Sequence, residues 1–257
     1  MLFLSAVLLI PGLQGRAQNL LVNGSFETPY VTTPTKVGYP TALWPWQTTA
    51  TNFEIWTNGW YNPHTGVGPL FSADGGQNLE IISSGCTNAT VWQTAPTVAG
   101  ERYAFSFYFT PRPTVPPDSF VVSINSNIVL SVVDDGTALT NFDWQRFTTD
   151  FVADGNLTAL SFSDTSLGNA GAGTHIDGVV LEHVPSLTLQ GAGSPGFNLC
   201  WLGVSNETYQ LQFRTNLTAG AWTNLGSPVI GDDNTNSILV TPNPDVPRAY
   251  FRIVTGP

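Results

Sequence analysis

A group of aromatic and amide residues between positions 44 and 64 is the part of this sequence whose side chains suggest binding chemistry. Carbohydrates present flat C–H faces bordered by hydroxyl groups, so proteins bind them with flat aromatic rings and with hydrogen bonds from polar side chains. The rings here are Trp44, Trp46, Trp56, Trp60 and Tyr61, with Asn58, Asn62 and His64 close by in the chain. The segment therefore predicts a sugar-binding surface in which Asn58 supplies an amide. The alternative is that several of these tryptophans fill a hydrophobic core.

Catalytic chemistry has no comparable support in the sequence. There is no Gly-x-Ser-x-Gly, no His-Glu-x-x-His and no phosphate-binding P-loop. Glycoside hydrolysis needs a pair of carboxylates, but none of the 18 acidic residues falls in a recognisable motif. The histidines His64, His175 and His183 lack metal-ligand spacing, and we expect His175 and His183 to be structural or exposed. An enzyme, or the accessory subunit of one, is therefore an alternative without a motif to support it.

The elements that must position these residues are short strands. The clearest spans residues 102–109, where Tyr103, Phe105, Phe107 and Phe109 alternate with smaller or more polar residues, so that one face is core. Further strands are expected at 19–22, 78–82, 89–93, 120–125, 128–133, 144–152, 157–162 and 175–182, and this places Trp92 and Trp144 in the core. Many short strands separated by Gly, Asn and Asp turns are typical of a β-sandwich or barrel.

The segment from Thr28 to Trp60 differs from these strands. Pro29, Pro34, Pro40 and Pro45 interrupt it, which predicts a long aromatic-rich loop with little regular structure before about residue 52. Loops of this length inside compact domains are often functional.

The strand pattern starts again near residue 185. Short strands are expected at 187–190, 197–202, 209–214, 221–225, 237–240 and 250–254. About 70 residues can form a small all-β domain. We therefore predict two domains, over residues 18–184 and 185–257.

Four segments, in order, resemble one known fold. They are 19–27 (NLLVNGSFE), 76–80 (GQNLE), 91–103 (VWQTAPTVAGERY) and 176–179 (IDGV). Together they resemble the galactose-binding-like jelly rolls, the fold of many carbohydrate-binding modules, over residues 19–184. Residues 199–224 resemble the small immunoglobulin- or fibronectin-like β-domains that commonly end exported bacterial proteins. The resemblance implies an all-β protein, a jelly-roll β-sandwich followed by a small immunoglobulin-like sandwich.

The resemblance also implies a structural Ca²⁺ ion. In the family, a Glu after the first strand and an Asp in the closing strand often hold it, and the matching positions here are Glu27 and Asp177. Calcium prefers several oxygen ligands, and backbone carbonyls could complete the set. The sequence departs from the family at Gly178, where a second Asp or Asn often stands. The alternative is that Glu27 and Asp177 cap turns or pair with arginine.

The composition limits the class of partner. Only 10% of the residues are charged, against ~25% in a typical soluble domain, and the formal net charge is −10. Nucleic acid and anionic membrane surfaces are excluded as partners, because both require a basic surface. The near absence of Lys- and Glu-rich stretches argues against helical classes. With 42% hydrophobic residues there is enough apolar material for a core.

The first residues predict export. An apolar run over 2–10 is followed by Pro11-Gly12 and by Gly15-Arg16-Ala17, which together predict a signal peptide over residues 1–17. No other run is long enough for a transmembrane segment. Cys86 and Cys200 fall in different predicted domains, so we expect free thiols, with one bridge between the domains as the alternative.

These expectations combine into one hypothesis. The chain is a secreted or cell-surface, non-catalytic carbohydrate-binding protein that acts on a glycan of a cell wall or on an extracellular polysaccharide. The competing class is a structural or adhesive surface protein without a sugar site.

Overall fold

The computed structural model describes residues 18–38, 43–62, 65–82, 86, 88–166, 172–191, 196–241, 243, 246 and 248–256. All the helical or strand structure in these ranges is β-strand, which confirms the predicted all-β class. No helix in the described part of the chain is long and apolar enough to cross a membrane. The predicted signal peptide, over residues 1–17, and His64 lie outside the described residues.

The chain divides into two compact units. One is Leu20–Leu181, and the other contains Glu182–Pro257. The division falls within β11 (His175–Val184), whereas the sequence predicted a boundary between residues 184 and 185.

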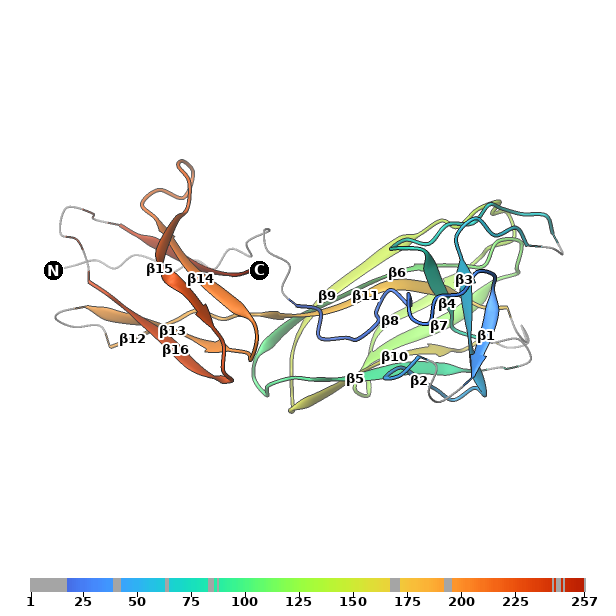
Figure 1. Ribbon diagram of the computed structural model, residues 1–257, viewed down its shortest axis with the longest axis horizontal. Coiled ribbons are helices and arrows are strands. Elements are labelled where there is room, and N and C mark those ends of the chain that lie inside the picture. The colour runs from blue at the N-terminus through green and yellow to red at the C-terminus, as the bar shows by residue number, and fades with distance from the viewer. Residues whose placement is uncertain are drawn as a thin grey trace. The chain divides into compact units, whose positions relative to one another are not determined.

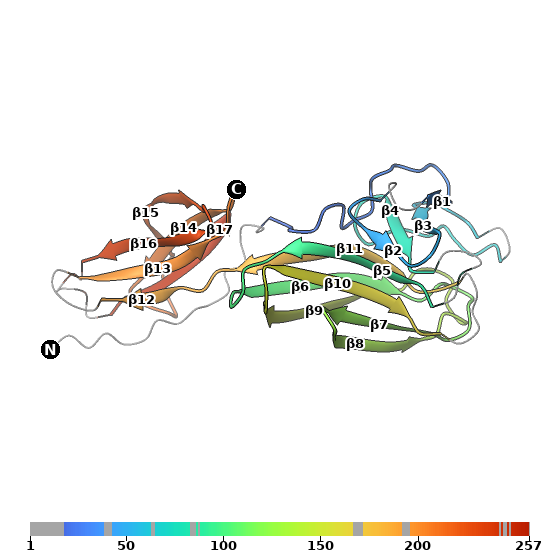
Figure 2. The same ribbon diagram turned by 90° about the horizontal axis from the view of Figure 1, so that it is seen from below.

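The first unit is a sandwich of two sheets (Figure 1). In spatial order, the first sheet contains β1 (Thr35–Gly38), β3 (Asn52–Thr57), β4 (Gln77–Glu80), β11, β6 (Arg102–Thr110) and β9 (Gln145–Val152). The second contains β2 (Gln47–Thr48), β5 (Thr90–Pro96), β10 (Leu157–Asp164), β7 (Asp118–Ile124) and β8 (Asn127–Asp134). Figure 2 shows β5, β10, β7 and β8 side by side. From β4 to β11 the chain passes repeatedly from one sheet to the other, which makes the sandwich a jelly roll, as predicted.

The inward faces of these sheets form an aromatic core. The alternation predicted for β6 is confirmed, since Tyr103, Phe105 and Phe107 are buried completely or almost so. Phe107 meets Phe162 of β10 edge to face, with ring centroids 4.9 Å apart. Trp46 lies in the same core, where its Nε1–H donates to the carbonyl of Asn23 at 3.0 Å.

The second unit contains two three-stranded sheets. One is formed by β12 (Thr188–Gln190), β13 (Phe197–Gly203) and β16 (Asn234–Val240). The other is formed by β15 (Thr223–Ile230), β14 (Thr208–Arg214) and β17 (Tyr250–Gly256). Leu199, Trp201 and Tyr209 are among its core residues. Its immunoglobulin-like character stays a prediction. Cys86 and Cys200 are both free thiols, and Cys200 is buried.

Candidate functional site

The predicted aromatic residues divide between the interior and the surface. Trp46 and Trp56 are buried, with 0% and 4% of their surface exposed, so neither ring offers a face to a ligand. Tyr61 and Trp44 are 54% and 67% exposed, but Trp44 lies in a different loop, just before β2. Trp60 is half-buried. The structure therefore brings Trp56, Trp60 and Tyr61 to one end of β3 and leaves Trp44 and Trp46 elsewhere.

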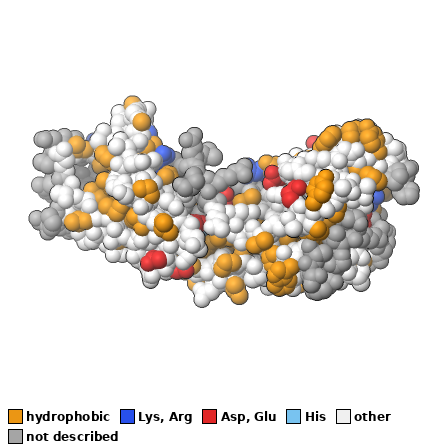
Figure 3. Space-filling model, in the orientation of Figure 1, with side chains coloured by type: hydrophobic (Ala, Val, Ile, Leu, Met, Phe, Trp, Pro, Cys, Tyr) orange, Lys and Arg blue, Asp and Glu red, His pale blue; other side chains and the backbone are white. Residues whose placement is uncertain are grey.

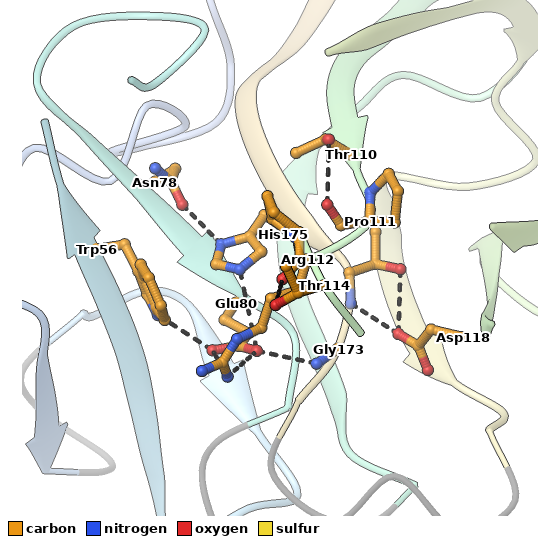
Figure 4. A network of polar contacts seen from close by, with 12 residues as sticks. Trp56, Asn78, Glu80, Thr110, Pro111, Arg112, Thr114, Asp118, Gly173 and His175 are labelled. Carbon is orange, nitrogen blue, oxygen red and sulfur yellow. Dashed lines mark hydrogen bonds and ion pairs between the residues drawn. The ribbon is translucent and has the colours of Figure 1, made fainter. Parts of the chain in front are cut away.

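Trp56 is part of a buried polar network on the face of the first sheet that points away from the core (Figure 4). Its Nε1–H donates to Oε2 of Glu80 on β4 at 3.0 Å. Oε1 of Glu80 accepts the backbone N–H of Gly173 at 2.9 Å and Nη1–H of Arg112 at 3.1 Å. The Arg112 guanidinium carbon also lies 4.9 Å from the centroid of the Trp56 ring. Glu80 thus joins a strand, a loop and an aromatic ring.

His175 completes this network from β11. Its Nδ1 lies 2.8 Å from Oδ1 of Asn78, which can only accept, so Nδ1 carries the proton. Nε2 has no hydrogen-bond partner among the described residues and lies 3.9 Å from Oε1 of Glu80. The imidazole contacts the Trp56 ring edge to face, with centroids 5.1 Å apart. His175 was expected to be structural or exposed, and its complete burial rules out the second of these roles.

The electrostatics of the network follow from its burial. Burial raises the pKa of Glu80 to about 8, although the Arg112 charge opposes that shift. Burial, and after it the Arg112 charge, hold the pKa of His175 well below its usual value. A protonated carboxyl group can act as a general acid, but Glu80 is 1% exposed and both its oxygens accept hydrogen bonds from the protein. We therefore assign the network a structural role, in which it holds in place the loops that cover it.

What it supports is a set of rings from two loops, of which Tyr61 and Phe71 are exposed and Phe142 and Trp144 are half-buried. The Phe142 ring packs on His175 with centroids 4.7 Å apart, and Trp144 packs on Phe142 at 5.2 Å and an angle of 59°. Nε1–H of Trp144 donates to the carbonyl of Phe71 at 2.8 Å, and Phe71 is 50% exposed. We call Tyr61, Phe71, Phe142 and Trp144 the aromatic loop surface. Figure 3 shows hydrophobic side chains gathered over loops of the first unit.

Polar residues border this surface. Asp143, between two of its rings in the chain, is exposed, and no described protein group hydrogen-bonds its carboxylate. Asn58 is different, because its Nδ2–H donates to the Gly75 carbonyl at 3.0 Å and its Oδ1 accepts the Ser72 N–H at 2.6 Å. The predicted amide of the site therefore holds the loop in shape, with one of its donors and one of its acceptor sites already used.

The sequence placed two tryptophans in the core that the structure places at the surface. Trp144 precedes β9, which begins at Gln145, and it is half-buried in a loop. Trp92 lies on β5 between the inward-facing Val91 and Gln93, so its half-buried ring points away from the core. Both predictions were wrong because a strand pattern does not say which face is covered. The run Phe142-Asp143-Trp144, with an acid between two rings, was the available signal.

Glu27 and Asp177 flank one turn before β4. Oε1 of Glu27 accepts the N–H groups of Gly76 and Gln77 at 2.7 and 2.8 Å. The Asp177 oxygens accept the N–H groups of Asp74 and Gly178, both at 2.7 Å. Burial raises the pKa of Asp177 to about 8. The two carboxyl groups thus cap the turn, the alternative that the sequence left open.

Calcium binding at Glu27 and Asp177 stays a prediction. Among the described residues, no group of three or more His, Cys, Asp or Glu side chains could hold a metal ion. The N–H groups that Glu27 and Asp177 accept already occupy three of their four oxygens.

The turn itself gives a test of the Glu27 contact. Gly75 has φ of +71°, and a Cβ atom there would collide with the Glu27 carboxylate. Gly75→Ala should therefore lower the free energy of unfolding by about 1–3 kcal/mol, measured by urea denaturation. Gly59→Ala is the matched control, because Gly59 has φ of +78° but nothing within 4 Å of the added Cβ. Equal losses for the two variants would show that only backbone strain matters.

Comparison with known proteins identifies a family and several structures of similar fold. The sequence model of a family described as "Protein of unknown function (DUF642)" matches residues 19–182. No curated protein matches the chain. Several of the similar solved structures are carbohydrate-binding modules, at low sequence identity.

Three of these structures illustrate the range of identity, coverage and TM-score. TmCBM61 in complex with β-1,4-galactotriose is 15% identical, with 65% of this chain and 100% of that chain covered and a TM-score of 0.44. A family 35 module from Clostridium thermocellum is 10% identical, with 58% and 97% covered and a TM-score of 0.34. The CBM22-1 xylan-binding domain of Paenibacillus barcinonensis Xyn10C is 13% identical, with 66% and 97% covered and a TM-score of 0.37.

Proposed function

This chain belongs to the DUF642 family, and we propose that it is an exported, non-catalytic carbohydrate-binding protein that acts at a cell wall or on an extracellular polysaccharide. The observation that carries the proposal is the aromatic loop surface, where exposed and half-buried rings from two loops rest on a buried polar network. The apolar and small residues at positions 1–17 support export.

The chemistry of this surface suits a sugar. Phe71 and Tyr61 expose about half of their surface, and apolar rings of this kind stack against the C–H face of a pyranose. The exposed Asp143 carboxylate can accept hydrogen bonds from sugar hydroxyl groups. A chain with only 10% charged residues suits a ligand that is largely neutral.

The surface is also held in place before a ligand arrives. The hydrogen bond from Trp144 to Phe71 fixes the indole, and the contact with His175 fixes Phe142. A ligand that meets ordered rings does not have to supply the free energy of ordering them. This is why we assign the supporting role to Glu80, Arg112 and His175, and the binding role to the rings and Asp143.

The test is binding of soluble polysaccharides to residues 18–257, by affinity electrophoresis and calorimetry, over a panel that includes β-1,4-galactan, xylan and cello-oligosaccharides. Trp144→Ala should weaken binding to the best ligand at least ~10-fold, which corresponds to about 1.4 kcal/mol. Trp44→Ala is the matched control, since Trp44 is 67% exposed but lies outside the surface, and it should leave affinity unchanged. If Trp44→Ala loses affinity while Trp144→Ala keeps it, the binding site does not lie at the aromatic loop surface.

The competing function is a structural or adhesive protein without a sugar site. It predicts no binding by the folded chain to any member of a broad glycan panel. The same panel therefore decides between the two classes.

A further inference from the structure

A second patch, on the sheet formed by β15, β14 and β17 of the Glu182–Pro257 unit, carries binding chemistry of a different kind. Tyr209 and Leu211 of the central strand β14 point into the core of this unit, so the alternating residues Gln210, Gln212 and Arg214 lie on the opposite face. In the register of the sheet, Gln212 pairs with Asn224 on one side and with Arg252 on the other. Three polar side chains thus stand in a row across the strands.

Hydrogen bonds join this row. Nε2–H of Gln212 donates to Oδ1 of Asn224 at 2.9 Å, and Nε–H of Arg252 donates to Oε1 of Gln212 at 2.8 Å. Because the Arg252 bond uses Nε, it fixes the plane of the guanidinium group. Its two terminal amino groups have no hydrogen-bond acceptor among the described residues.

Trp222 brings a second arginine to the same place. The guanidinium carbons of Arg214 and Arg252 each lie 4.4 Å from the centroid of the Trp222 ring. Nη2–H of Arg214 also donates to the carbonyl of Leu217, and its buried Nε has no hydrogen-bond partner in the described structure. Burial, followed by the charge of Arg214, lowers the pKa of Arg252. Two like charges are therefore held beside one ring.

No acid of this sheet balances them. The strands β14, β15 and β17 contain no Asp or Glu, and neither does the connection over residues 215–222. Within the described residues, neither Arg214 nor Arg252 forms an ion pair, whereas Arg102 and Arg112 do. In a chain with 8 basic and 18 acidic residues, two unpaired arginines beside one tryptophan form a local positive site.

We propose that Arg214, Arg252 and Trp222 form a binding site for the anionic group, carboxylate or sulfate ester, of an acidic polysaccharide. The planar guanidinium group matches such groups in geometry, and an anion bound near the two arginines offsets their like charges. The saccharide class rests on the proposed function, whereas the preference for an anion rests on the two arginines alone.

The experiment measures binding of the chain over residues 18–257 to alginate oligosaccharide, dextran sulfate and neutral β-1,4-galactan in 0.1 M NaCl, where the net negative charge of the chain is screened beyond about 10 Å. The double variant Arg214→Gln/Arg252→Gln should bind the acidic ligands at least ~10-fold more weakly than the parent chain. Its affinity for any neutral ligand of the aromatic loop surface should not change. The relative affinity for alginate and dextran sulfate identifies the anionic group.

Two further variants keep the result interpretable. Arg102→Gln removes the same charge from an exposed arginine of the first unit and should leave binding unchanged. Arg252→Lys keeps the charge, loses the planar fork and should bind with intermediate affinity while melting like the parent chain. Absence of acidic-ligand binding by the parent chain, or equal losses in Arg102→Gln and the double variant, would overturn the proposal. Neither result bears on neutral-sugar binding by the first unit.

Discussion

Replacing Glu80 with alanine should lower the free energy of unfolding of the Leu20–Leu181 unit by about 2–6 kcal/mol, because at least two buried donors lose their acceptor. The Arg112 side chain is only 16% exposed, and its Nη1–H would lose the Glu80 oxygen that accepts it. The Trp56 Nε1–H and the Gly173 N–H would lose their acceptor in the same step. Unsatisfied buried donors cost about 1–3 kcal/mol each, so the whole network contributes to the loss.

The matched control is the exposed ion pair between Arg102 and Asp150. Its N–O distance is 2.7 Å, shorter than the 3.1 Å between Arg112 and Glu80, but its side chains are 54% and 41% exposed. Asp150→Ala should therefore cost at most ~1 kcal/mol, because water screens the pair. Urea denaturation of both variants at pH 7 measures the difference. A larger loss in Asp150→Ala than in Glu80→Ala would follow the shorter distance and not the burial, and it would contradict this prediction.

The part of the fold that the sequence predicted is the part that local signals determine. On β6, the alternation of Tyr103, Phe105 and Phe107 with smaller residues identifies both the strand and its inward face, because side chains alternate across a sheet. The proline-rich segment before β3 was expected to have little regular structure, but it forms β1 and β2, which pair with β3 and β5. The β6 inference does not need to know which strand lies next to which, whereas predicting β1 and β2 would have needed that knowledge.

The candidate site depends on which strands lie next to each other, and local sequence signals do not show this. Trp56 and Trp60 are the same residue type four positions apart, yet Trp56 is buried and Trp60 half-buried, because Glu80 and Arg112 lie next to Trp56. Glu80 faces His175 and Glu54 through strand pairings that join distant segments. The pattern of a single sequence does not show which strands pair, so the network was not predicted. Glu80 entered the sequence analysis only within segment 76–80, which resembles the jelly-roll family.

The same buried network predicts that the first unit loses stability as the pH rises from 6.5 to 8. Folding raises the pKa of Glu80 from 4.5 to about 8, so in this interval the folded state keeps a proton that the unfolded state has released. Because the unfolded state then binds fewer protons, the free energy of unfolding falls with pH. Asp177, with its pKa raised to about 8, acts in the same direction. Each group contributes about 2 kcal/mol over these 1.5 pH units.

The interval matters because His175 acts in the opposite direction below it. Folding lowers the pKa of His175. Below pH 6.5 the unfolded state therefore binds a proton that the folded state does not, and the free energy of unfolding falls as the pH falls. Above pH 6.5 the unfolded-state imidazole releases its remaining protons, so this contribution approaches its full value and the two acids determine the larger change. Denaturation at pH 6.5, 7.25 and 8 therefore measures mainly the acids.

The variant Glu80→Gln separates the contribution of Glu80 to this pH dependence from the contribution of Asp177. Glutamine keeps an oxygen acceptor for Trp56 or Gly173 but has no proton to release, so the variant should lose about 2 kcal/mol less than the parent chain between pH 6.5 and 8. At pH 6.5 the parent Glu80 is already mostly protonated, and the two proteins should differ chiefly in the hydrogen bond to Arg112. A parent chain whose stability is constant or rises over this interval would mean that Glu80 is ionised in the folded state, with Arg112 stabilising its charge more strongly than burial opposes it.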